Sequence, residues 1–296
     1  MKQNHPIFRG IATALITPTT PTGIDYDRFG RLIDWQIQQG INALVICGTT
    51  GESSTLTDAE HRRAIAFACE RVNGRVPVIA GTGSNETDYA VELTKSACAD
   101  GADAVLVVTP YYNKAGDDGL IQHFTAIAER VQVPIIAYNV PSRTGVNLKP
   151  EIVVELAKHP RIRGIKEASG NMRQIAELCR LAGDGLYLYA GDDADAFGVL
   201  ALGGQGVISV AANVVPAAMH ELAARFRGGE IAESRAMQLS LLPLIRALFC
   251  EVNPIPVKAA LAEMGRIGEE LRLPLTPLRG EKRAQLLQTL RDCALL

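Results

Sequence analysis

Short runs of apolar and β-branched residues recur along the chain, and each of them ends in polar residues. Such runs, bounded by turn signals, predict strands. Eight of them fall at residues 11–17, 43–50, 76–82, 104–112, 134–139, 162–166, 186–192 and 206–209. Amphipathic stretches typical of helices lie between most of them, at residues 28–39, 58–72, 87–99, 119–131 and 148–157. The chain therefore alternates strand and helix.

This alternation predicts the α/β class, and eight βα units that close on themselves predict a (β/α)8 TIM barrel. A doubly wound open sheet is the alternative. Its usual cofactor signal, GxGxxG after the first strand, is absent, because Gly81-Thr82-Gly83 follows the third strand and lacks the third glycine. The barrel is the favoured prediction.

After about residue 215 the strand signals stop and only helical patterns follow, at residues 216–227, 231–250, 255–264 and 280–290. The first of these helices completes the barrel. We therefore expect a catalytic barrel over residues 1–227 and a C-terminal helical appendage over residues 228–296. The apolar faces of such an appendage favour self-association.

Composition narrows the class of function. The 296 residues are 47% hydrophobic, which permits a substantial core, and 30 basic residues face 32 acidic ones without a like-charge run. Binding to nucleic acid or to an anionic membrane surface is not expected from this balance. No stretch reaches the roughly 18 apolar residues of a membrane span. The six cysteines form no CxxC pair and no compact disulfide pattern, so reduced thiols and a cytoplasmic location are expected.

Lys166 is the most informative residue, because it is a cation that closes the short apolar run at residues 162–166. The preceding run, at residues 134–139, carries a phenol, Tyr138, close to its end. If the two runs are neighbouring parallel strands about 4.8 Å apart, the amine and the phenol meet. In strand alternation Ile162, Gly164 and Lys166 share one face, so Gly164 is expected to leave space beside the lysine.

An amine beside a hydroxyl suits imine chemistry. Lysine attacks a ketone only as the neutral amine, which an apolar barrel favours, and collapse of the carbinolamine moves protons on and off oxygen. Tyr138 is the natural partner for that proton transfer. Other hydroxyls are expected at the same mouth, from Thr17, Thr49, Thr50, Thr82, Thr109, Tyr111, Tyr112 and Ser209.

Metal and phosphate sites are less well supported. The five histidines lie in or at the ends of helical stretches, or in the N-terminal tail, and form no cluster at the strand ends. The acidic run at residues 192–195 is better explained as the capped start of a helix than as a hard-cation site. Gly203-Gly204 precedes the eighth strand, whereas barrel phosphate sites follow strands seven and eight. We expect neither a metal nor an organic cofactor.

Four ordered motifs at the predicted strand ends resemble the class I pyruvate-lyase barrels, the N-acetylneuraminate lyase family. They are Gly48-Thr49-Thr50-Gly51-Glu52-Ser53, Val108-Thr109-Pro110-Tyr111-Tyr112-Asn113, Tyr138-Asn139-Val140-Pro141-Ser142-Arg143-Thr144-Gly145 and Gly164-Ile165-Lys166-Glu167-Ala168. The likeness runs essentially end to end and includes Gly191-Asp192-Asp193, Gly206-Val207-Ile208-Ser209 and Asn253-Pro254-Ile255-Pro256-Val257-Lys258.

The resemblance implies roles for the catalytic residues. Lys166 is expected to form the Schiff base with pyruvate and Tyr138 to donate and accept the proton above it. Thr49 and Tyr112 are expected to complete a hydroxyl relay, with Tyr112 reaching into the site of a neighbouring subunit. Because the family is homotetrameric, a dimer of dimers is the expected assembly.

The resemblance also implies how the substrates bind. Thr50 and the backbone of Ile208 are expected to hold the pyruvate carboxylate and its surroundings, and Gly191 to line the pocket. Arg143 is expected to bind the carboxylate of the second substrate.

The implied reaction condenses pyruvate with L-aspartate 4-semialdehyde and feeds diaminopimelate and lysine synthesis. A related aldolase acting on a sialic acid, a 2-keto-3-deoxy sugar acid or 4-hydroxy-2-oxoglutarate stays open at this point. Arg143 favours the semialdehyde, because sugar-acid relatives generally lack an arginine there. A barrel that only binds ligands, without catalysis, would be expected to lack some of the catalytic residues. All four of them, Lys166, Tyr138, Thr49 and Tyr112, are present.

One departure concerns regulation. Many lysine-regulated members of the family carry a glutamate where this chain has Tyr89 and a histidine where it has Asp58, although Ser53, His61 and Asn85 are retained. A neutral phenol does not offset the charge of an effector amine, and Asp58 is expected to cap a helix. Inhibition by lysine is therefore not expected.

Overall fold

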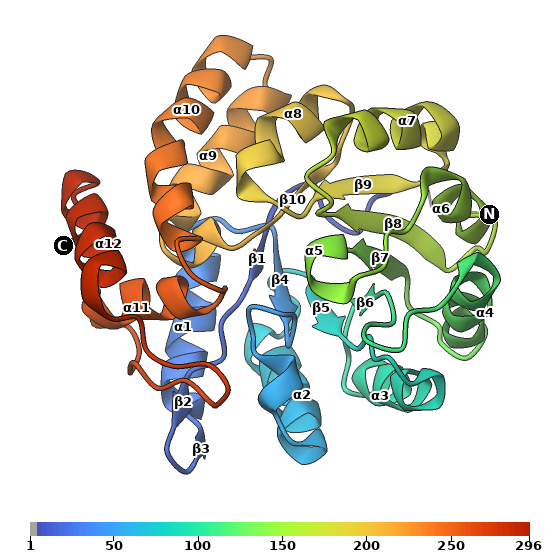
Figure 1. Cartoon of the computed structure of the whole chain (residues 1–296), viewed down its shortest axis with the longest axis horizontal. Coiled ribbons are helices and arrows are strands. Elements are labelled where there is room, and N and C mark those ends of the chain that lie inside the picture. Colours follow the sequence, from blue (N-terminus) through green and yellow to red (C-terminus); the bar gives the residue numbers. More distant parts are fainter. Residues whose placement is uncertain (1–4) are drawn as a thin grey trace.

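Eight parallel strands close into a barrel in the computed structural model, which describes residues 5–296 (Figure 1). The order around the barrel follows the chain. The strands are β1 Gly10–Ala14, β4 Ala43–Ile46, β5 Val78–Gly81, β6 Ala104–Val108, β7 Ile135–Asn139, β8 Ile162–Glu167, β9 Tyr187–Ala190 and β10 Gly206–Ser209. All eight predicted strands are confirmed, and so is the predicted closure.

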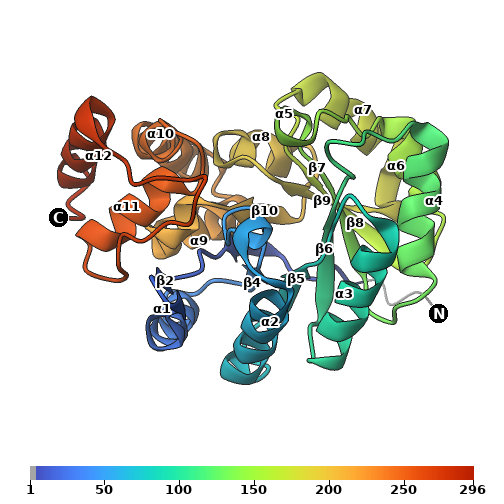
Figure 2. The ribbon, with the colours of Figure 1, turned by 60° about the horizontal axis from the view of Figure 1, so that its bottom comes forward.

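Helices follow the barrel strands and surround them, as Figures 1 and 2 show. They are α1 Tyr26–Gln38, α2 Asp58–Val72, α3 Thr87–Ala99, α4 Asp117–Ala128, α5 Pro141–Thr144, α6 Pro150–Leu156, α7 Met172–Ala182, α8 Ala196–Ala201 and α9 Pro216–Arg227. Short 3₁₀ turns lie at η1 Ser53–Thr55, η2 Gly183–Gly185, η3 Asp193–Asp195 and η4 Ala211–Asn213. A two-stranded hairpin of β2 Thr19–Thr20 and β3 Gly23–Ile24 follows β1 and is not signalled by the sequence pattern.

The start of α2 illustrates how the local sequence sets a helix boundary. The Thr57 side chain accepts a hydrogen bond from the Glu60 backbone, and the Glu60 side chain bonds back to the Thr57 backbone. This capping box satisfies donors that the first turn leaves unpaired. The prediction that Asp58 is the cap is wrong by one residue, and the Asp58 carboxylate binds the Arg62 guanidinium instead.

Two apolar layers hold the barrel together. The larger one lies between strands and helices, and the smaller one fills the barrel interior with side chains such as Ala12, Val45, Ile79 and Ile208. Branched apolar residues on alternate strand positions supply both layers. Below the strand ends the interior is a packed core, so chemistry is confined to the mouth.

A bulge between β7 and β8 changes one predicted face. Ile135 pairs with Ile162, but Ile136 pairs with Gly164, so β8 contains one extra residue. Ile162 consequently belongs to the layer under the helices, whereas Gly164 contacts the interior residue Ile136. The prediction that Ile162 shares a face with Lys166 is wrong, because strict alternation does not survive the extra residue.

Three further helices, α10 Ile231–Leu248, α11 Ile255–Glu263 and α12 Gly280–Asp292, gather on one flank of the barrel, opposite α4 and α6 (Figures 1 and 2). These helices match the predicted appendage. The domain boundary between residues 227 and 228 stays a prediction. In the described part of the chain, no helix is both long enough and apolar enough to cross a membrane.

Candidate active site

Lys166 and Tyr138 are neighbours at the mouth of the barrel. They are paired in register across β7 and β8, and the Lys166 Nζ atom lies 4.2 Å from the centre of the Tyr138 ring. Both side chains are almost fully buried, with exposed fractions of 5% and 6%. The predicted meeting of amine and phenol is thus present in the fold.

The space beside Gly164 is occupied. A Cβ atom placed on Gly164 would lie 3.2 Å from Cε2 of Tyr189 and 3.1 Å from the Tyr187 carbonyl oxygen. The Tyr189 ring stacks on Phe8 at 4.4 Å, and its hydroxyl donates to the Phe8 carbonyl. Gly164 therefore admits a packed aromatic ring next to Lys166, and the expectation of open space there is wrong.

The strand ends around Lys166 are fixed by the buried Glu167 carboxylate. Asn139 lies at the end of β7, and its Nδ2 atom donates to the Glu167 carboxylate at a distance of 3.1 Å. The Ser169 backbone amide donates to the same carboxylate at 2.7 Å. The Asn139 Oδ1 atom in turn accepts from the Leu148 amide. These bonds tie the loops that follow β7 and β8, and so hold Tyr138 and Lys166 in register.

The loop after β4 places Thr49 and Thr50. Thr50 is buried and its Oγ1 atom accepts a hydrogen bond from Asn253 Nδ2 at 2.9 Å. Glu52 takes a left-handed conformation, with φ of 57°, that non-glycine residues seldom adopt. Lys258 binds the Glu52 carboxylate at 2.7 Å and holds it there.

Arg143 and Thr49 line one cavity of about 360 Å³. Val140, two residues after Tyr138, is part of the same wall, which connects the cavity to the barrel mouth. Arg143 lies on the short helix α5, where its Nη2 atom donates to the Asn253 carbonyl at 3.1 Å. The guanidinium is exposed and faces a space that a small ligand can enter.

Gly191 directly follows β9, and Ile208 lies on β10. The Gly191 amide donates to the Glu167 carbonyl at 2.7 Å, and a Cβ atom at Gly191 would lie only 2.7 Å from that of Ala168. The chain passes so close here that only glycine fits. Ile208 is fully buried in the barrel interior.

The acidic run at residues 192–195 has structural roles. The Asp192 carboxylate accepts from the Ala194 amide and caps the turn η3. The buried Asp193 carboxylate accepts from the amides of Val210 and Ala211, directly after β10. Burial raises the pKa of Asp193, and these donors act against that rise. In residues 5–296 no group of three or more His, Cys, Asp or Glu side chains is placed to hold a metal ion.

Tyr112 lies apart from the other predicted catalytic residues. It has 90% of its surface exposed and a φ of 70°, in the loop after β6. A single copy of the chain therefore does not bring this phenol to Lys166.

Several predicted mouth hydroxyls have local partners instead. Thr17 donates to the Gly51 carbonyl, Thr82 accepts from Thr94, and Ser209 accepts from the Ala212 amide. These three hydroxyls stabilise the loops. Thr49, Thr50, Thr109, Tyr111 and Tyr138 remain as candidates for chemistry at this mouth, since the buried Thr109 hydroxyl has no hydrogen-bond partner and Tyr111 lines the same cavity as Thr49.

Sequence reasoning missed Asn253 and Lys258 as site-supporting residues. Lys258 stands in the otherwise apolar run at residues 255–261, all of it buried. A lone lysine in such a run is a signal for a buried cation that needs a partner. The identity of the partner had no local signal, because Glu52 lies 206 residues away.

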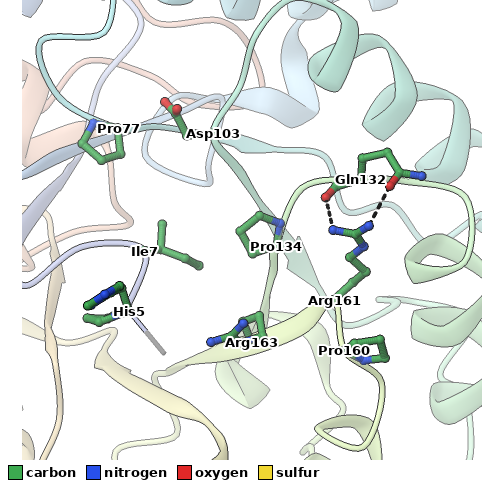
Figure 3. Close-up of a pocket in the computed structure, with 10 residues that line it drawn as sticks. His5, Ile7, Pro77, Asp103, Gln132, Pro134, Pro160, Arg161 and Arg163 are labelled. Carbon is green, nitrogen blue, oxygen red and sulfur yellow. Dashed lines mark hydrogen bonds between the residues drawn. The ribbon is translucent and has the colours of Figure 1, made fainter. Parts of the chain in front are cut away.

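A second, wider cavity of about 830 Å³ lies at the opposite end of the barrel (Figure 3). It is lined by residues that precede the strands, among them Pro77, Asp103 and Pro134. The Arg161 guanidinium there donates to both the carbonyl and the side chain of Gln132, and Asp103 accepts from the Val78 amide. These contacts stabilise turns, and the N-terminal face of such a barrel is the stability face.

The fold and the site together define a (β/α)8-barrel enzyme with a buried lysine and a tyrosine at adjacent strand ends. The model of the dihydrodipicolinate synthetase family matches residues 7–293. The chain belongs to this family.

Relatives agree with the family match. The chain is 51% identical over 291 residues to a 4-hydroxy-tetrahydrodipicolinate synthase from Acetivibrio thermocellus, covering 98% of this chain and 99% of the relative. The crystal structure of the chloride-inhibited dihydrodipicolinate synthase from Acinetobacter baumannii, complexed with pyruvate, superposes with a TM-score of 0.95 at 45% identity, covering 97% and 99% of the two chains. A crystal structure of the enzyme from Cyanidioschyzon merolae with lysine bound has a TM-score of 0.95 at 38% identity, covering 99% and 100%.

Proposed function

We propose that the chain condenses pyruvate with L-aspartate 4-semialdehyde through an imine on Lys166, giving 4-hydroxy-tetrahydrodipicolinate. The overall reaction is that of the family to which the chain belongs, a lyase step of the diaminopimelate route to lysine. The observation that carries the mechanism is the buried Lys166 amine, 4.2 Å from the Tyr138 ring centre at the barrel mouth.

The chemistry begins with attack of the neutral Lys166 amine on the pyruvate ketone. The carbinolamine then loses water, with Tyr138 giving the proton that the leaving hydroxyl needs. Loss of a methyl proton from the imine to the hydroxyl relay gives an enamine, whose carbon attacks the aldehyde carbon while the aldehyde oxygen takes up a proton. The amino group of the semialdehyde then attacks the imine carbon and displaces the Lys166 amine, which closes the ring and frees the enzyme. The protonated imine nitrogen is the electron sink for loss of the methyl proton, so the proposed mechanism needs neither a metal nor an organic cofactor.

The binding groups divide between the two substrates. Thr50, the Ile208 backbone and Gly191 surround the pyruvate carboxylate in this proposal. Arg143 binds the carboxylate of the semialdehyde, since a guanidinium forks onto carboxylate oxygens and this one lines the entry cavity. Sugar-acid substrates would call for polyol-binding groups at that position, and the family match does not favour them.

The proposed relay needs a second copy of the chain. Thr49 passes protons between Tyr138 and Tyr112, and Tyr112 comes from a neighbouring subunit of a homotetramer built as a dimer of dimers. The 90% exposure of Tyr112 in the single chain supports a role for it outside its own barrel. All six cysteines are free thiols, which supports the proposal that the enzyme acts in the reducing environment of the cytoplasm.

Borohydride reduction in the presence of pyruvate tests the proposal. The reduced imine should add one pyruvyl group to Lys166, located by peptide mass spectrometry, and should inactivate the enzyme. Lys166→Arg should give no adduct, because a guanidinium stays protonated. Lys258 is the internal control, since this other buried lysine is bound to Glu52 and should stay unlabelled. An adduct on any lysine other than Lys166 would overturn the mechanism.

A further inference from the structure

We propose that Asn253 is a positioning residue that orients the Thr50 hydroxyl as a hydrogen-bond donor towards the pyruvate carboxylate. This inference rests on the proposed function, and it adds a residue from the C-terminal helical region to the substrate site. Asn253 is only 6% exposed, and its Nδ2 atom lies 2.9 Å from Thr50 Oγ1 across 203 residues of sequence.

The direction of this hydrogen bond carries the argument. The amide nitrogen only donates, so the Thr50 oxygen is the acceptor in the contact. The hydroxyl proton of Thr50 is then directed elsewhere. A carboxylate only accepts hydrogen bonds, and a hydroxyl that is already receiving a bond on its oxygen is polarised for donation to it. Asn253 thus makes Thr50 a donor before the substrate arrives.

The same residue also holds Arg143. The Asn253 backbone carbonyl accepts from Arg143 Nη2 at 3.1 Å. Asn253 therefore contacts both carboxylate-binding groups of the proposal. Its side chain bonds to Thr50, which is proposed for pyruvate, and its backbone carbonyl bonds to Arg143, which is proposed for the semialdehyde. A substitution of the Asn253 side chain removes only the contact to Thr50, so its effect on pyruvate binding can be measured without loss of the contact to Arg143.

A buried ion pair fixes the position of Asn253 relative to the loop. Lys258, on the helix that starts at Ile255, binds Glu52, two residues beyond Thr50. The Lys258 ammonium also donates to the Thr17 carbonyl and to Thr19 Oγ1. The loop is thus held by Asn253 and Lys258 at two points, and the Asn253–Thr50 contact is part of a rigid frame.

The test is a double-mutant cycle between Asn253→Ala and Thr50→Val, with the pyruvate KM as the readout. Asn253→Ala alone should raise this KM about tenfold, which corresponds to about 1.4 kcal/mol, because the Thr50 hydroxyl is no longer held as a donor. The kcat should change far less. In the Thr50→Val background the same substitution should raise the KM no further. Equal factors in both backgrounds would overturn the inference.

Asn253→Asp gives a pH signature that loosened packing does not produce. The new carboxylate accepts a hydrogen bond from the Thr50 hydroxyl and repels the pyruvate carboxylate. The ratio of the variant's pyruvate KM to that of the wild type should therefore be highest at neutral pH. Protonation of the carboxyl restores a donor, so this ratio should fall as the pH is lowered. A pH-independent ratio would contradict the proposed donor role.

Ser234→Ala is the matched control in the same helical region. Ser234 is buried on α10 and donates to the Leu222 carbonyl, so its loss weakens packing far from the site. It should lower thermal stability and leave the pyruvate KM unchanged. Borohydride labelling separates the two proposals: a wild-type enzyme without an adduct overturns both, whereas an adduct with an unchanged KM in Asn253→Ala overturns only the role of Asn253.

Discussion

Lys258 and Glu52 form an ion pair of 2.7 Å between the C-terminal helical region and the loop that carries Thr49 and Thr50. The two side chains are 0% and 2% exposed. Burial lowers the pKa of Lys258, and the Glu52 carboxylate acts in the opposite direction. A buried pair of this kind gives little net stability, but loss of one partner leaves the other charge buried and uncompensated.

We therefore predict that Lys258→Met destabilises the protein by about 3–5 kcal/mol and lowers kcat, because Glu52 then moves and carries the Thr49–Thr50 segment with it. Chemical denaturation and initial rates measure the two effects. Lys95→Met is the control: the Lys95–Glu92 pair is exposed, and its loss should cost about 1 kcal/mol or less. Similar costs for both variants would show that the buried pair does not organise the loop.

The second prediction concerns acid stability and the pair Glu60–Arg272. Arg272 Nη1 donates to Glu60 at 2.6 Å, and this hydrogen bond is the main cause of a Glu60 pKa lowered from 4.5 to about 2. A carboxyl with a depressed pKa stabilises the fold above its unfolded pKa, and the stabilisation is lost as pH falls through the folded pKa. At neutral pH it amounts to about 2 kcal/mol once solvent screening is included.

Glu60→Gln should therefore be less stable than wild type at pH 7, and the difference between them should shrink as the pH falls from about 4.5 to about 2. Urea denaturation across that range measures it. A difference that stays constant with pH would mean that the Glu60 charge contributes nothing to stability.

Arg143→Ala tests substrate choice. If the guanidinium binds only the semialdehyde carboxylate, its removal should raise the semialdehyde KM about a hundredfold, from about 3 kcal/mol of a charge-assisted contact, and leave the rate of pyruvate labelling by borohydride nearly unchanged. Arg161→Ala, at the opposite end of the barrel, should change neither. Equal losses in both steps would refute this role for Arg143.

Complementation tests whether Tyr112 acts in a neighbouring site. Tyr112→Phe and Lys166→Arg should each be nearly inactive alone. When equal amounts of the two variants are unfolded, mixed and refolded together, half of the subunit pairs should contain one chain of each variant. In such a pair, one of the two sites holds both the native Lys166 and the native Tyr112. About a quarter of the wild-type activity should return. A mixture as inactive as its parts would place Tyr112 in the site of its own chain.

The sequence predicted the barrel well because its signals are local. Each strand is a short apolar run closed by polar residues, and α2, α3 and α9 begin and end at the predicted residues. The 3.6-residue and two-residue periods that encode these elements need no tertiary information. Tyr138 and Lys166 followed from the same logic, since adjacent parallel strands bring their ends together.

The parts that were missed depend on contacts between distant segments. The bulge at Ile162 reflects how β8 pairs with β7, and the filling of the Gly164 space depends on Tyr189 from the next strand. The hydrogen bond of Asn253 to Thr50 links residues 203 positions apart. The periodicity of the sequence does not indicate which distant residues pair, so the contacts that support the site could be identified only from the structure.

The cleft beside the active site bears on regulation. Tyr89, Ser53 and His61 line the same cavity as Arg143. The Tyr89 hydroxyl donates to Asp58 Oδ1 at 3.0 Å, and Arg62 Nε lies 2.9 Å from the same carboxylate. The hydrogen bond from Arg62 is the main cause of the lowered pKa of Asp58. Asp58 is thus an ionised carboxylate whose charge is already paired with a guanidinium.

An effector lysine brings a cationic amine, and binding it away from water requires an anion that is not already paired. The phenol of Tyr89 is neutral, and Arg62 competes for Asp58. We therefore predict little or no inhibition when lysine is titrated against the initial rate at saturating pyruvate. Tyr89→Glu should make the enzyme lysine-sensitive, because it places an anion in the cleft. Tyr89→Phe, which breaks the Asp58 contact without adding charge, should stay insensitive. Strong inhibition of the wild type, or equal sensitivity of the two variants, would show that charge at position 89 does not decide the response to lysine.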